Sequence, residues 1–482
     1  MLAGVGMAGE ARGQAIPQAG SRDALQQEAR LRELQQLQLD TRMKVNPDIP
    51  PEQRAYLDYG AFLQLQYLNL DDPTGNNHSL REIDFIPYAR LNIDGGVHEL
   101  FLRGIFGWRD FSEGDSFDGR GDEPVDGDID RGYYKFDLQR AKGARGEDPG
   151  NFQFTFQGGR DLAYWANGLV LGQVLDGITV TTGNDKFTLD AVAGVTPTRT
   201  VDFDPTRPNF DHNTRRGFFG GMLSTEVGDN RPFVYGLYQR DWNEDDHSTV
   251  GLIETNYQYD SAYIGAGSAG ALGDRVRYGV EFAYEFGHSL SNSFRIAPGG
   301  ALVPIDQTKD DISAWAFNAK IDYLAHDVYQ TRLSGELTVA SGDDDRGTTN
   351  GTFNGNAPFT TDTAFNAFGL LNTGLAFSPE VSNIIALRGG IATFPLPDSG
   401  AFRRMQIGAD FFVFSKYNKD APIDEPTGSD RFLGWEPDVY LNWQLTSDVT
   451  LAVRYGVFFP NERNFASDDV RQFIFTGLTF AF

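Results

Sequence analysis

The chain ends with RQFIFTGLTFAF, residues 471–482, in which aromatic and aliphatic residues alternate with small or polar ones. This period of two is that of a β-strand, whose successive side chains point to opposite faces. The apolar face carries Ile474, Leu478, Phe480 and Phe482, and the other face carries Arg471, Gly477 and Thr479. A strand facing lipid needs an apolar side chain at every second position, and a closed barrel leaves no free edge. The segment therefore predicts the last strand of a transmembrane β-barrel, paired with the first strand.

The same alternation continues from about residue 56 to the end, for example in IDFIPYARLNI (83–93) and DVYLNWQL (438–445). We expect about eighteen strands, an even number, as in bacterial single-chain outer-membrane barrels. The links between them alternate between tight turns and long, acidic, glycine-rich segments. The long links are residues 111–130, 197–215, 288–311 and 341–382. With the N-terminus in the periplasm, every long link falls on the extracellular side.

One segment tests this count. FGLLNTGLAFSPEVSN (368–383) has the composition of a nineteenth strand. An odd number of strands would place the two termini on opposite sides of the membrane and invert the order of short and long links. We therefore assign residues 368–383 to an extracellular loop that folds inward.

The composition narrows the class of partner. The chain has 67 acidic and 41 basic residues, a formal net charge of −26, which argues against a nucleic-acid partner. Mean hydropathy is −0.38 and no run of about 20 apolar residues occurs, so no transmembrane helix is expected. Aromatic residues nevertheless make up 13% of the chain. The absence of cysteine fits a chain secreted into an oxidising compartment.

The N-terminal region precedes the barrel. Residues 1–15 resemble the small-residue end of a signal peptide, with a disordered N-terminus as the alternative. Residues 16–55 are interpreted as a helical or periplasmic arm, and residues 56–482 as the barrel. Within the arm, residues 21–43 are rich in strong helix formers. This helix lies in a periplasmic arm, or it is an oligomerising or plugging helix.

Three stretches carry a resemblance to a known family: QGGRDLAYW (157–165) with VLDGITV (174–180), ASGDDD (340–345) with GTFN (351–354), and the last-strand region 433–460. Together they resemble the outer-membrane porins of the alginate-export family, over roughly residues 57–482. The resemblance implies a monomeric eighteen-stranded barrel. The best-understood role in that family is export of alginate, an anionic uronate polymer, through an arginine-lined pore, and many members have no known substrate.

Strand alternation predicts which charged residues line the lumen. The lumen should contain Arg90, Arg103, Lys135, Arg240, Arg277, Arg332, Arg388, Arg454 and Arg471, together with Asp84, Glu99, Asp137, Glu281, Glu285, Glu336, Asp410 and Asp438. This lining is mixed, whereas the export role in the family requires a cationic constriction. The arginines either balance nearby carboxylates or set solute selectivity.

Arg332, Arg388 and Arg454 could form a positive stripe that binds a passing sugar acid. In the rival interpretation, Glu336 and Asp438 neutralise this stripe. Arg160 belongs to the family motif and is also a candidate pore-lining residue. Alternation from Phe156 points it outward, but a bulge at the glycines 158–159 would turn it inward.

The loop carboxylates Asp343, Asp344 and Asp345 could hold calcium, with a solvated loop as the alternative. No other cofactor is expected. The six histidines are scattered and none sits beside a nucleophile, so we predict no catalytic residue and no enzyme.

The sequence thus predicts an outer-membrane channel of a diderm bacterium that passes hydrophilic solutes or an anionic oligo- or polysaccharide by diffusion. The alternative is a structural or adhesive barrel with a closed lumen. The expected partners are outer-membrane lipid and lipopolysaccharide, the transported solute, and the barrel-insertion machinery, which would read the C-terminal Phe482.

Overall fold

The computed structural model describes residues 27, 30–35, 54–112, 123–244, 246–297, 301–349, 351–467 and 469–482. The proposed signal segment, residues 1–15, lies outside the described residues. So does most of the proposed arm.

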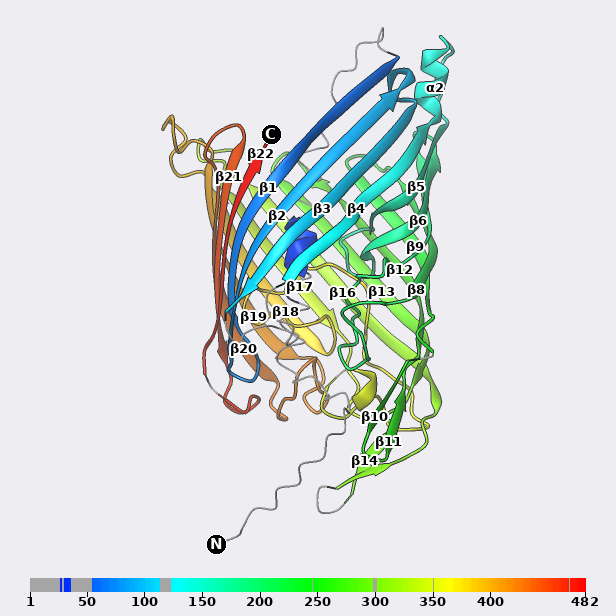
Figure 1. The fold of residues 1–482 in the computed structure, drawn as a ribbon, viewed down its shortest axis with the longest axis vertical. Helices are drawn as coiled ribbons and strands as arrows, with labels where there is room; N and C mark the ends of the chain where they lie inside the picture. The colour runs from blue at the N-terminus through cyan, green and yellow to red at the C-terminus, as the bar shows by residue number, and fades with distance from the viewer. Residues whose placement is uncertain are drawn as a thin grey trace.

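Eighteen strands form one closed antiparallel barrel in which each strand pairs with its neighbour along the chain (Figure 1). Their bounds are β1 Ala55–Asp71, β2 Asn77–Ile93, β3 His98–Phe111, β4 Glu123–Asp137, β5 Gln153–Tyr164, β6 Gly172–Gly183, β7 Phe187–Val195, β8 Arg216–Thr225, β9 Asn230–Asp241, β12 Tyr259–Leu272, β13 Val276–Leu290, β16 Lys309–Leu324, β17 Arg332–Ala340, β18 Ile384–Thr393, β19 Met405–Lys416, β20 Phe432–Gln444, β21 Val449–Pro460 and β22 Arg471–Ala481. The predicted fold class is confirmed.

The remaining elements are small and lie in the links. Two hairpins pair β10 (His247–Val250) with β11 (Ile253–Asn256) and β14 (Phe294–Ile296) with β15 (Leu302–Pro304). The short helices are η1 (Asp94–Gly96), α2 (Leu138–Ala144) and η2 (Thr352–Asn354). Among the described residues, no helix is long and apolar enough to cross a membrane.

The barrel closes between its first and last strands. Leu63 of β1 lies opposite Phe480 of β22, and Leu65 lies opposite Leu478. The backbone of Phe482 extends this ladder, because the Ala61 N–H donates to the Phe482 carbonyl at 2.8 Å and the Phe482 N–H donates to the Ala61 carbonyl at 3.0 Å. The C-terminal aromatic therefore belongs to the seam of the barrel, and the prediction that the last strand pairs with the first is confirmed.

The two faces of the wall differ as the alternation predicts. On β1 and β2, the outward side chains Leu57 and Ile83 are exposed, whereas Gln64 and Asp84 face the lumen and are buried. In water, exposed leucine and isoleucine rows would be costly, but they match the hydrocarbon of a bilayer.

Most strand starts agree with the sequence prediction to within about three residues, but β4 and β12 do not. β4 begins at Glu123, nine residues before the start expected near residue 132, and so includes part of the segment 111–130 predicted as a long link. β12 begins at Tyr259, because the alternating residues near 250 form the loop hairpin β10–β11. Residues 368–383 contribute no barrel strand, as predicted, and lie in the 43-residue link between β17 and β18 (residues 341–383).

Two adjacent positions on β1 test which face of the strand contacts lipid. We expect Leu65→Arg, which points toward lipid, to lower the free energy of unfolding by up to about 4 kcal/mol, whereas the lumen substitution Gln66→Arg costs much less. Urea unfolding in lipid vesicles, followed by tryptophan fluorescence, measures both. Equal costs at these adjacent positions would contradict the assigned faces.

Candidate functional site: a constriction built from inward-folded loops

The long link between β17 and β18, residues 341–383, folds into the barrel and is held there by carboxylates of the wall. Glu436 on β20 accepts hydrogen bonds from the backbone N–H groups of Leu375 (2.5 Å), Ala376 (2.8 Å) and Phe377 (2.8 Å). Glu285 on β13 accepts one from the Asn366 N–H at 2.9 Å. Both glutamates are completely buried. Charge-assisted hydrogen bonds in a buried site are strong, so these contacts fix the loop across the lumen.

A second, shorter loop between β5 and β6, residues 165–171, is held in the same way. Glu281 on β13 accepts hydrogen bonds from the backbone N–H groups of Asn167 at 2.8 Å and Leu169 at 3.4 Å, and from the Tyr235 hydroxyl at 2.8 Å. The two loops also contact one another: the Leu370 N–H donates to the Gly168 carbonyl at 2.8 Å. Glu281 and Glu285 were expected to line the lumen, and they do face it. However, they bind loop backbone.

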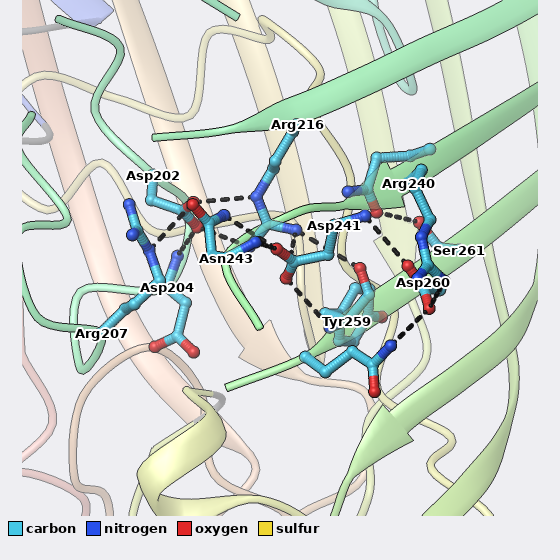
Figure 2. Close-up of polar contacts among 12 residues, drawn as sticks. Asp202, Asp204, Arg207, Arg216, Arg240, Asp241, Asn243, Tyr259, Asp260 and Ser261 are labelled. Carbon is cyan, nitrogen blue, oxygen red and sulfur yellow. Dashed lines mark hydrogen bonds and ion pairs between the residues drawn. The ribbon is translucent and has the colours of Figure 1, made fainter. Parts of the chain in front are cut away.

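A network of buried ion pairs, centred on Arg216 at the start of β8, lies at the extracellular rim of the barrel. Figure 2 shows its guanidinium between two carboxylates. Its Nε lies 2.8 Å from one carboxylate oxygen of Asp202, its Nη2 lies 2.9 Å from the other, and its Nη1 lies 3.1 Å from Asp241. Arg207 pairs with Asp202 at 3.4 Å. Because Asp202 lies in the link between β7 and β8, this network ties that link (residues 196–215) to the wall.

The same guanidinium joins the rim to the inward loop. The Arg216 guanidinium lies 4.6 Å from the centre of the Phe203 ring and 5.4 Å from that of Phe368. Phe368 belongs to the loop 341–383, and its ring also packs edge-on against Phe218 at 4.8 Å. A cation stacked on aromatic rings in a desolvated site adds to the stability of the arrangement. Three extracellular links therefore meet inside the barrel.

Among the predicted lumen arginines, most have acidic partners. Arg388 lies 2.8 Å from Glu336, which also accepts a hydrogen bond from Asn318. Arg103 is completely buried against Asp130, and Arg332 lies 3.8 Å from Asp322. The structure thus brings Arg388 together with Glu336, as in the neutralising interpretation.

Two other predicted lumen arginines, Arg90 and Arg454, have no such carboxylate partner among the described residues. The Arg90 guanidinium lies 5.5 Å from the centre of the Phe101 ring. Among the described residues, Arg454 has no ion-pair partner within 4 Å, and its electrostatic neighbours are Tyr440 and Asp410. Asp438 lies opposite Asp410 on the neighbouring strand and is buried, with one oxygen that accepts no hydrogen bond. Among the described residues, no ion pair within 4 Å joins Asp438 to Arg332, Arg388 or Arg454.

Arg160 faces outward, so its assignment as a pore-lining residue is corrected. Its Nε and Nη2 contact the two oxygens of Asp176 on β6 at 2.6 Å and 2.8 Å. The register of β4 with β5 runs unbroken through Arg160, so no bulge turns it. Gly159 has φ +135°, and a Cβ there would lie 2.2 Å from the Gly132 carbonyl oxygen, so both the backbone conformation and the close approach require glycine. The glycines allow close strand approach and leave the alternation unchanged.

Arg240 is a second correction. On β9, Tyr235, Leu237 and Gln239 are buried toward the lumen, so Arg240 points outward, where it lies 2.6 Å from Asp260 (Figure 2). Because both faces of β9 carry apolar side chains, alternation assigns the lumen and the lipid face of this strand the wrong way round. The lumen face is apolar here because the inward loops pack against it.

In the acidic segment 343–345, Asp343 binds backbone groups of the loop. One oxygen of Asp343 accepts the Asp345 N–H at 2.8 Å and the other accepts the Thr363 N–H at 2.9 Å, so this carboxylate organises the loop backbone. Within the part of the chain that the structure describes, no group of three or more His, Asp or Glu side chains is placed to hold a metal ion.

A sequence model of alginate export proteins matches residues 147–468, about two thirds of the chain. The chain belongs to the alginate export family. This family and the barrel place it in the outer membrane of a Gram-negative bacterium, and both the family and the fold are those of channels. None of the curated proteins matches the chain in sequence.

Solved porins of Pseudomonas aeruginosa share the fold of this family member. OccK11 (OpdR) has a TM-score of 0.52 at 12% identity, covering 88% of this chain and 95% of the porin. OpdK solved with vanillate has a TM-score of 0.52 at 11% identity, covering 88% and 98%. At such identity the likeness concerns the fold alone.

Several residues that build the constriction of this family member cannot be identified from the sequence. Arg216, Asp202 and Glu436 were not singled out. Glu436 does lie two residues before Asp438 on the polar face of its strand, so alternation could have placed it in the lumen. Nothing in the sequence marks its partners, because they are backbone N–H groups of a distant loop.

We expect Glu436→Gln to loosen the inward loop, because the neutral amide is a weaker acceptor than a carboxylate for the three N–H groups. Hydrogen exchange at Leu375, Ala376 and Phe377 should accelerate by about ten- to a hundred-fold. Glu99→Gln, at a lumen carboxylate bound to Tyr133, is the matched control. Unchanged exchange in Glu436→Gln would show that other contacts hold the loop.

The rim network should respond to acid. Burial alone would raise the pKa of Asp202, but the Arg216 and Arg207 guanidinium groups lower it overall below its ordinary value. A lowered folded-state pKa means that the stabilisation is complete above about pH 4 and is lost as the pH falls below it. The measurement is hydrogen-exchange protection of the Asp204 amide, which donates to Asp202. Asp202→Asn should lower this protection and remove its dependence on pH.

Proposed function

We propose that this outer-membrane channel passes small hydrophilic solutes by diffusion and discriminates only weakly by charge, with no covalent chemistry. The observation that supports this proposal most directly is the pairing of lumen arginines with carboxylates, above all Arg388 with Glu336 at 2.8 Å. A wall whose cations are already neutralised presents little net field to a passing ion, whereas an anion-selective pore needs uncompensated cations.

The inward loops favour small solutes over a polymer. The loops 165–171 and 341–383 are each fixed to the wall by buried carboxylates, so they restrict the lumen in the folded state. Transport of an anionic polysaccharide is the second candidate, and it is supported by the family alone. A structural barrel with a closed lumen is the remaining alternative, since the loops occupy the lumen.

Planar-bilayer recording separates these functions. The proposal expects stepwise conductance in simple salts, with an anion-to-cation permeability ratio within about three-fold of unity. A correctly inserted barrel that conducts no ions at any salt concentration, even with loop 341–383 shortened, would favour the structural alternative. Block of the current by uronate oligomers would favour the polysaccharide.

Two substitutions test the role of the lumen arginines. The double variant Glu336→Gln/Arg388→Gln removes a neutral pair, so the reversal potential in a salt gradient should stay as in the wild type. Arg454→Gln removes a cation that has no ion-pair partner among the described residues. The negative charge of the neighbouring Asp410 is then less compensated, so the permeability ratio should shift toward cations. A loss of anion preference in the double variant would instead support the positive stripe.

A further inference from the structure

The described helical residues of the N-terminal region, 30–35, lie inside the barrel and not in a periplasmic arm (Figure 1). We call this segment the lumen helix. One side of it contacts the wall: Leu31 is buried in the same apolar cluster as Leu68, Leu80 and Phe475, and Arg32 forms an ion pair with Glu82 of β2. The lumen helix therefore rests on the part of the barrel where β1, β2 and β22 meet.

The other side of the lumen helix contacts the inward loop. The Arg30 guanidinium donates to the Ser378 carbonyl at 3.0 Å, to the Thr373 hydroxyl at 3.1 Å and to the Pro379 carbonyl at 3.4 Å. Gln27 donates to the Phe377 carbonyl at 3.4 Å. These acceptors all belong to the loop 341–383. The helix thus spans the space between the wall and the loop.

A cavity of about 140 Å³ lies where the helix meets the extracellular links. Arg30 and Glu33 line it from the helix, Asp202 and Phe368 line it from two of the links, and Arg471 lines it from β22. The lumen helix is therefore part of the boundary of the central cavity. Removing it would enlarge that space toward the rest of the lumen.

The lumen helix and the two inward loops differ in the kind of contact that attaches them to the rest of the barrel. The loops are held by backbone N–H groups bound to completely buried glutamates of the wall, and by the buried ion pairs of Arg216. Among its described residues, 30–35, the helix is held by side chains, with Leu31 as the buried apolar contact. Few buried apolar contacts and side-chain bonds are the properties of segments that open locally.

We propose that the lumen helix is an autoinhibitory plug that docks reversibly between the barrel wall and loop 341–383, and that its undocking opens the channel. The loops are the fixed constriction and the helix is its movable part. This inference rests on the proposed channel function.

A crosslink between helix and wall tests the plug in the intact chain, because the natural sequence has no cysteine. Arg32→Cys/Glu82→Cys provides two unique thiols at an observed contact, which a flexible bis-methanethiosulfonate reagent can bridge and a reductant can release. The bridged channel should stay in its low-conductance state, and reduction should restore opening. Gln406→Cys/Asn442→Cys, across β19 and β20, is the matched control and should not respond, because both residues lie on the wall.

Single substitutions give the complementary result. Arg32→Ala removes one charge-assisted contact of the helix, so the open probability should rise about ten-fold. Arg463→Ala, at an exposed arginine in the link between β21 and β22 that pairs with Asp430, should leave the open probability unchanged. Heat-modifiable gel mobility verifies that each variant forms the barrel.

The outcomes distinguish failure of the plug from failure of the channel. If the wild type conducts but neither the bridge nor Arg32→Ala changes its opening, the plug proposal is overturned and the channel stands. If the wild type and every helix variant stay closed in folded form, the channel function itself fails.

Discussion

The architecture of the lumen depends on one interaction, the binding of loop backbone N–H groups by buried carboxylates of the barrel wall. Glu281, Glu285 and Glu436 each lie on a barrel strand that is held in place by backbone hydrogen bonds to its neighbouring strands. A loop entering a barrel exposes peptide groups that need partners, and an unpaired buried N–H costs about 1–3 kcal/mol. The rigid wall provides acceptors at fixed positions, so two loops take up defined paths across an otherwise wide lumen.

The need of buried polar groups for partners also explains how so acidic a chain can carry many charged side chains in its lumen. Carboxylates that bind backbone or arginine are compensated where they lie, as with Asp202 between Arg207 and Arg216. The acidic excess of the chain therefore says little about the field inside the barrel. The field depends on the few groups left without partners, and this is why the lumen wall and the net charge lead to different expectations about selectivity.

Alternation in the sequence predicted the barrel, its even strand number and its closure at Phe482, because lipid imposes a strict pattern on outward side chains. It failed at Arg240, since the lumen near β9 is packed with loop residues such as Phe368 and is itself apolar. When both faces of a strand are apolar, hydrophobicity no longer indicates which face is inside. The roles of Glu436 and Arg216 could not be predicted, because their partners are distant in sequence and include backbone groups without a sequence signature.

The outward pair of Arg160 with Asp176 has a consequence for assembly. Both residues stand on the outer wall, where a charge is tolerated only beside an opposite charge, and Arg160 also lies 3.4 Å from Asp128 of β4. If β5 and β6 were displaced along one another during assembly, the Asp176 carboxylate would face the membrane without this guanidinium. Only the native register of β5 and β6 places the two opposite charges side by side, so this ion pair favours the correct strand pairing during insertion.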